Sequence, residues 1–191
     1  MKLPTWLVLL CWILAASVGN TVLNVVDRLL GLPFFFDSLF TAVGAGVLGW
    51  IPGLLIATLT QLLISVTLLF IEQQQWGLAL PFVLCQFETV LVIGLMVRFG
   101  SLRTILSLIV AIFAVALGNS VLGSMIATFL YGGITLHGAD FLVAGLLMGG
   151  QSLFEAAFWA RVPINLVDKA IAVVLAYFAV QRWGGAFAVN R

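Results

Sequence analysis

Residues 105–130 read ILSLIVAIFAVALGNSVLGSMIATFL and contain no charged side chain. A helix needs about 20 mainly apolar residues to cross the hydrocarbon core of a bilayer, so this stretch is long enough to form a membrane span. Comparable apolar runs cover residues 6–26, 34–71, 78–97 and 166–180. The sequence therefore predicts an all-α, polytopic membrane protein.

The composition of the whole chain supports this class. Of 191 residues, 63% are hydrophobic and 8% are charged, whereas soluble domains average about 45 to 50% and about 25%. The chain contains eight Lys and Arg and seven Asp and Glu, and it has no basic run. Nucleic acid is therefore excluded as a partner. Cys11 and Cys85 lie singly in apolar runs, and this pattern predicts no disulfide framework and no metal site. We expect no cofactor.

Six spans fit the apolar pattern best and form a single transmembrane domain over residues 1–191. The second and third spans are joined by the tight turn Gly49–Gly53, in which Pro52 suits the first helical position. Residues 141–160 are predicted as one or two short outer helices, and a seventh full span there is the alternative. The predicted spans are residues 5–26, 34–49, 52–72, 79–98, 103–131 and 163–182.

The positive charges predict the orientation of these spans. Cytoplasmic flanks of membrane helices carry the excess of Lys and Arg. With the N-terminus inside, five basic residues lie on the cytoplasmic side, two lie outside, and Lys169 falls within the last span. This gives an N-in, C-in topology with Lys2, Arg98, Arg103, Arg182 and Arg191 inside and Arg28 and Arg161 outside.

The start of the last predicted span carries the strongest group of polar residues. Asn165, Asp168 and Lys169 have the spacing of one helix face, and Arg161 lies just before them across Pro163. An ionisable side chain inside a membrane usually faces the bundle interior or a wet cavity. We therefore predict that these four residues contribute to a substrate pocket, with a structural ion pair of Asp168 as the competing interpretation.

Other polar residues are scattered over the earlier spans. Glu88 is predicted to face the pocket, because a carboxylate facing lipid is the worse alternative. Asn20 and Asn24 are interpreted as hydrogen-bonding links between helices. Asp37 is expected to cap the second span, and His137 is expected to be solvated in an outer loop.

Small residues mark a second surface on the first span. Cys11, Ala15 and Gly19 recur at four-residue spacing, and such stripes let helices approach closely. They pack internally or form a docking face for another membrane subunit.

Three stretches are similar to a known transporter family. LPFFFDSLFT at residues 32–41 and AGVLGWIPG at 45–53 resemble the start of substrate-binding S components of energy-coupling factor (ECF) transporters, and RVPINLVDK at 161–169 resembles the start of their last helix. The length and the six-helix organisation agree, so the resemblance covers essentially the whole chain.

The resemblance implies a function, partners and a location. It implies a multi-pass protein of a prokaryotic plasma membrane that captures a vitamin or a related trace nutrient at its outer face. Its partners would be a membrane coupling subunit and a pair of cytoplasmic ATPases. In the family an Ala-xxx-Ala motif on the first helix meets the coupling subunit, and here Ala15 and Gly19 are the nearest match. The family also places its pocket on the outer halves of the later helices, where Glu88, Asn165, Asp168 and Lys169 fall.

Two other classes of function compete with transport. A membrane sensory or structural interaction protein can share a Gly-rich hairpin, although a sensor would be expected to continue into an output domain beyond Arg182. A membrane enzyme would require a reactive constellation, and the sequence contains no HExxH or GxSxG motif. We therefore expect a binding subunit and not an enzyme.

Overall fold

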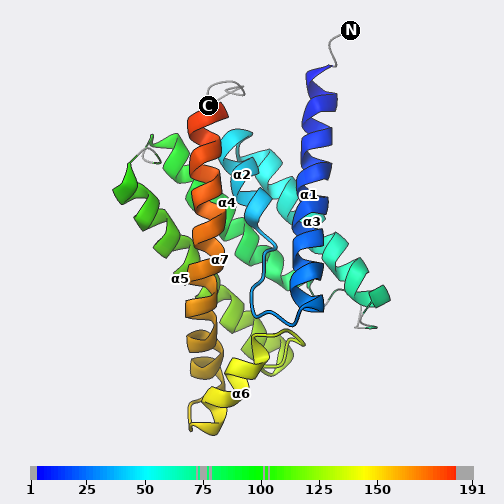
Figure 1. Ribbon diagram of the computed structural model, residues 1–191, viewed down its shortest axis with the longest axis vertical. Coiled ribbons are helices and arrows are strands. Elements are labelled where there is room, and N and C mark those ends of the chain that lie inside the picture. Colours follow the sequence, from blue (N-terminus) through cyan, green and yellow to red (C-terminus); the bar gives the residue numbers. More distant parts are fainter. Residues whose placement is uncertain are drawn as a thin grey trace.

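The computed structural model describes residues 4–71, 73, 77, 79–100, 102 and 104–183. Within these residues every regular element is a helix (Figure 1). The N-terminal end of α1 and the C-terminal end of α7 lie at the same end of the molecule, and α6 lies at the opposite end. The elements are α1 (Thr5–Leu29), α2 (Leu39–Val47), α3 (Trp50–Ile71), η1 (Leu80–Phe82), α4 (Val83–Arg98), α5 (Ile105–Tyr131), α6 (Asp140–Met148) and α7 (Leu153–Trp183).

Five helices in the described part of the chain are long and apolar enough to cross a membrane, namely α1, α3, α4 with η1, α5 and α7. The architecture is that of a polytopic helical membrane protein, as the apolar runs predict. Large apolar side chains cover the outside of these helices, and small, polar and aliphatic side chains fill the contacts between them. On α1, the outward face carries Leu10, Leu14, Val18, Val22 and Val26, and the buried face carries Ser17, Asn20, Thr21, Asn24 and Asp27.

The prediction of a helix over residues 34–49 is wrong in its first part. The chain runs without helical structure from Gly31 to Ser38, and α2 has nine residues. Nine residues rise about 14 Å, roughly half the hydrocarbon thickness, so a sixth full-length helical span is not confirmed. We call residues 31–38 the inner strap, because Figure 1 shows this segment turning back from the end of α1 toward the middle of the bundle.

The surroundings of α2 explain how a half-length helix is accommodated. It packs against α1, α3, α4 and α7, and non-helical backbone at membrane depth is tolerated where protein covers it. Close approach depends on glycine: a Cβ at Gly46 would lie 2.7 Å from Val180, and a Cβ at Gly53 would lie 3.0 Å from that of Ala45. The Gly-rich hairpin is therefore an internal packing surface.

The last helix begins ten residues earlier than predicted, at Leu153 instead of residue 163. Ser152 and Glu155 start it with reciprocal hydrogen bonds: the Ser152 backbone N–H donates to Glu155 Oε2 at 3.0 Å, and the Glu155 N–H donates to Ser152 Oγ at 3.4 Å. This is a capping box. Pro163 lies inside the helix, so residues 153–160 belong to α7, and α6 is the one short helix found within the predicted outer segment 141–160.

Candidate functional site

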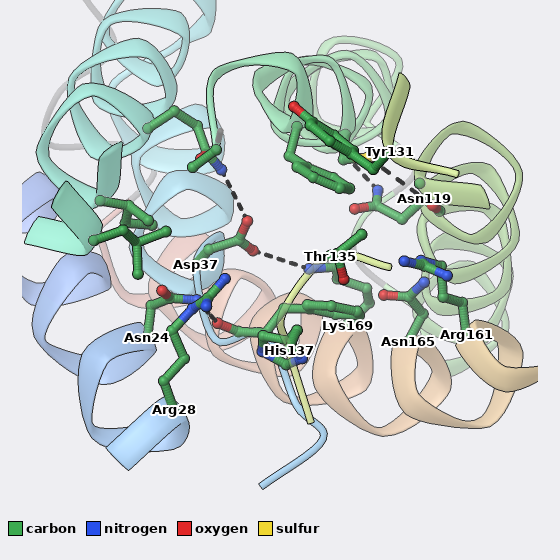
Figure 2. Close-up of a pocket in the computed structure, with 18 residues that line it drawn as sticks. Asn24, Arg28, Asp37, Asn119, Tyr131, Thr135, His137, Arg161, Asn165 and Lys169 are labelled. Carbon is green, nitrogen blue, oxygen red and sulfur yellow. Dashed lines mark hydrogen bonds and ion pairs between the residues drawn. The ribbon is translucent and has the colours of Figure 1, made fainter. Parts of the chain in front are cut away.

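A cavity lies between all five long helices at the end of the molecule opposite to the termini. Its volume is about 60 Å³, which is room for several water molecules, since one needs about 10 to 15 Å³. The inner strap and residues 132–139 complete its wall (Figure 2). Its polar lining residues are Asn24, Arg28, Asp37, Gln61, Asn119, Tyr131, Thr135, His137, Arg161, Asn165 and Lys169.

Lys169 holds the strap to α7. Its side chain is buried, and Nζ lies 2.7 Å from Asp168 Oδ2, 2.7 Å from Ser38 Oγ and 3.4 Å from Asp37 Oδ1. Gln61 Nε2 of α3 donates to the other oxygen of Asp37 at 3.0 Å. An ammonium group has three hydrogens, so the described contacts use all three donors of Lys169.

Asp168 lies behind Lys169 and does not line the cavity. Its Oδ1 accepts the backbone N–H of Phe36 at 3.2 Å. Phe36 has φ 45°, a left-handed conformation that is uncommon for residues other than glycine. The strap is thus strained where it presents its N–H to Asp168, and this arrangement favours the structural interpretation of the Asp168 pair.

Arg161 lines the cavity from inside α7, at 1% exposure. It therefore lies within the last helix, whereas the sequence placed it just before a span that begins at residue 163. Its Nη1 donates to the Ala157 carbonyl at 3.1 Å. Its Nε and Nη2 have no hydrogen-bond partner among the described residues.

Asn165 also lines the cavity, and its Nδ2 donates to Ser120 Oγ at 3.0 Å. Glu88, in contrast, does not reach the cavity. Its Oε2 accepts a hydrogen bond from Asn119 Nδ2 at 2.6 Å, and a Cβ at Gly118 would collide with its carboxylate. Of the five predicted substrate-binding residues, the structure brings Arg161, Asn165 and Lys169 to the cavity wall and leaves Asp168 and Glu88 outside it.

The predicted docking stripe divides between two environments. Cys11 and Ala15 are exposed. Gly19 faces α2, where a Cβ would lie 2.7 Å from the Phe40 ring. The spacing alone could not separate these environments, because four-residue steps drift around a helix by about 40° each.

Several cavity residues were not predicted as such. Asp37 binds Lys169 and Gln61, and no side chain caps α2. His137 is buried at 7% exposure, stacks on Phe35 with ring centroids 4.9 Å apart, and places Nε2 3.4 Å from Asp27. The expectation of a solvated histidine is wrong. Gln61 lies in an apolar run. An amide side chain inside a predicted span indicates a polar site in the bundle, and this signal could have identified Gln61 as a cavity residue.

The interpretation of Asn20 as a link between helices is confirmed. Its Nδ2 lies 3.0 Å from Thr41 Oγ1 and 3.3 Å from Thr60 Oγ1, and its Oδ1 accepts the Phe40 N–H. Asn24 donates to the Phe35 carbonyl at 2.7 Å and also lines the cavity.

Comparison of the chain with protein-family models, with curated proteins and with solved structures gives no match.

Proposed function

We propose that this protein is the substrate-capture membrane subunit of an ECF-type importer for a vitamin or a related small polar nutrient. The observation that carries the proposal is the cavity between five apolar helices, which is lined by many polar side chains and in which two guanidinium nitrogens of Arg161 have no partner among the described residues. Burying polar groups costs free energy unless they find partners. A protein that only anchors other chains has no need of such a space, whereas a capture protein does.

The proposed direction of capture follows from the charges at the ends of the helices. Arg98 ends α4 and Arg182 lies in the last turn of α7, at the end of the bundle that carries the termini. Cytoplasmic flanks carry the positive excess, so the cavity end is proposed to face outward. A ligand larger than a few waters would enter when the inner strap and residues 132–139 separate.

The proposed partners are a membrane coupling subunit and a cytoplasmic ATPase pair. The described helices have the dimensions of membrane spans, and in this proposal the ATPase pair supplies the energy for import. The exposed face of α1, with Cys11 and Ala15 among large apolar side chains, is the proposed contact surface.

The proposal is tested by identifying what the protein retains. The full chain is purified in mild detergent from its native host, and released small molecules are compared by mass spectrometry with those from two variants. Asn165→Phe fills the cavity, whereas Val167→Phe places the same ring on the 49% exposed outer face of α7. A nutrient should be enriched with the wild type and Val167→Phe and be lost with Asn165→Phe. Equal retention by all three, or no enriched compound, would count against capture.

A further inference from the structure

The two buried cations of α7 differ in how the protein uses them. Lys169 has a hydrogen-bond acceptor for each of its donors. Arg161 has one described acceptor, the Ala157 carbonyl of its own helix, and no described carboxylate oxygen lies within 4.0 Å of it. A buried group without its partners is costly. Arg161 is therefore the buried cation of α7 whose donors are available to a ligand.

The free part of Arg161 is the edge that binds oxyanions best. The Nε–H bond and one Nη2–H bond lie in the guanidinium plane and point outward from the same edge, so a carboxylate or phosphate can accept both N–H groups in parallel. Gly123 of α5 lies against the side chain, since a Cβ there would be in van der Waals contact with Arg161 Cδ at 3.4 Å. Figure 2 shows the guanidinium beside Asn119 and Asn165, across the cavity from Asp37.

The charge distribution along α7 separates Arg161 from Lys169. Lys169 faces two carboxylates, Asp37 and Asp168, so that cluster has a net charge of −1 when all three are ionised and repels an anion. Arg161 lies eight residues away, about 12 Å along the helix axis. Asp140, whose charge also acts on Arg161, is engaged by the Thr135 N–H at 2.7 Å and by Thr135 Oγ1 at 2.9 Å.

We propose that Arg161 is an oxyanion subsite of the cavity, which takes a carboxylate or phosphate group of the ligand through Nε and Nη2, and that Lys169 makes no ligand contact. This inference rests on the proposed capture function and narrows it to ligands that carry an anionic group. The Asp37 side of the cavity then receives the hydrogen-bond donors of the same molecule.

The test uses the full chain in detergent with inorganic phosphate, acetate and the neutral analogue acetamide as probes, at constant ionic strength. Thermal unfolding should shift upward with phosphate or acetate and stay unchanged with acetamide; which of the two anions acts at lower concentration identifies the preferred oxyanion. Arg161→Gln should weaken the response at least tenfold, and Arg161→Lys should keep part of it. Arg182→Gln, on the exposed last turn of the same helix, should respond like the wild type.

A second readout separates ligand binding from a structural role. Without probes, Arg161→Gln should unfold at the same or a higher temperature than the wild type, because it removes a buried charge that has no carboxylate partner. A lower unfolding temperature, or an unchanged oxyanion response in Arg161→Gln, would overturn the subsite. Retention of a neutral nutrient without any oxyanion response would overturn the subsite and leave the capture function standing. An oxyanion response without a retained nutrient would overturn the capture function and leave the subsite standing.

Discussion

At the scale of single residues, Lys169 makes three polar contacts and joins α7 to the inner strap. Asp168 lies next to it in sequence, whereas Ser38 and Asp37 are 131 and 132 residues away. Removing one member of a buried ion pair leaves an uncompensated charge, which costs far more than the pair itself contributes. This asymmetry gives Lys169 a testable structural role.

We expect Lys169→Met to destabilise the protein by about 3 to 5 kcal/mol, because two buried carboxylates lose their cation. Thermal and denaturant unfolding of the purified protein measure this loss. The double variant Lys169→Met, Asp168→Asn should recover most of it, since it neutralises the carboxylate at 2.7 Å. Val167→Met, on the outer face of the same helix, is the matched control and should unfold like the wild type. A Lys169→Met protein of wild-type stability would contradict this role.

The sequence could predict part of this cluster. The depth of Lys169 in an apolar helix required a counter-charge, and the adjacent Asp168 was a candidate from spacing alone. Asp37 and Gln61 could not be paired with it, because no local pattern relates residues on three different elements. Arg161 lines the cavity but lies within α7 instead of before it, because its environment depends on where α7 begins.

At the scale of the elements, the two segments over the cavity meet by direct backbone contact. A Cβ at Gly138 would collide with the carbonyl oxygen of Leu32, so residues 132–139 and the start of the inner strap touch without intervening side chains. His137 and Arg28 add polar contacts here, the latter by donating to the Leu136 carbonyl at 3.1 Å. Arg28 and His137, which make these contacts, also line the cavity, so the approach shapes its wall.

Gly138→Ala should force these segments apart. We expect a loss of about 1 to 3 kcal/mol, as for other substitutions that overfill a packed site, and faster release of any retained ligand. Unfolding experiments and ligand dissociation rates measure the two effects. Gly145→Ala is the control, because no atom lies within 4 Å of its Cβ and the residue is in α6, where alanine is favoured by about 1 kcal/mol. The same behaviour in both variants would rule out the contact as the cause.

The first helix gives a prediction about partners. Ala15→Leu should leave the unfolding temperature nearly unchanged, since Ala15 is exposed, and should reduce co-purification with a coupling subunit and ATPases by tenfold or more. Gly19→Leu is unsuitable for this test, because its side chain would strike Phe40. The control is Val121→Leu, an outward position on α5, away from the proposed contact surface. Full co-purification of Ala15→Leu would remove this face from the proposed interface.

Helix positions were predictable where apolar runs are long and flanked by clear breaks, as in α3, α4 and α5. The start of α7 was missed, although Ser152 and Glu155 have the capping-box spacing that marks a helix N-terminus. The first part of the second span was missed for a different reason. The run Phe34-Phe35-Phe36 is apolar enough for a helix, and tertiary contacts of Asp168 and Asn24 with this backbone hold it in another conformation.

At the scale of the whole molecule, the proposed orientation in the membrane predicts which ends of the helices are accessible from outside the cell. In a protein whose native Cys11 and Cys85 are replaced, Gln73→Cys should react with a membrane-impermeant maleimide in intact cells. Phe99→Cys should react only after the membrane is permeabilised. These positions lie at opposite ends of the bundle, after α3 and after α4. The reverse pattern would place the cavity toward the cytoplasm and exclude uptake from outside.

The contact of Lys169 with Asp37 also has a consequence for biogenesis. A ribosome that makes this chain releases α1, the inner strap and α2 long before α7. Asp37 therefore lacks its cation, Lys169, while more than a hundred further residues are synthesised. In insertion intermediates, the strap should therefore lie near the water interface, where Asp37 stays hydrated. It should move into the bundle only after α7 has inserted. Helix α7 would then complete the interior around the first half of the described residues, and nascent chains truncated before α7 should be substrates for membrane quality-control proteases.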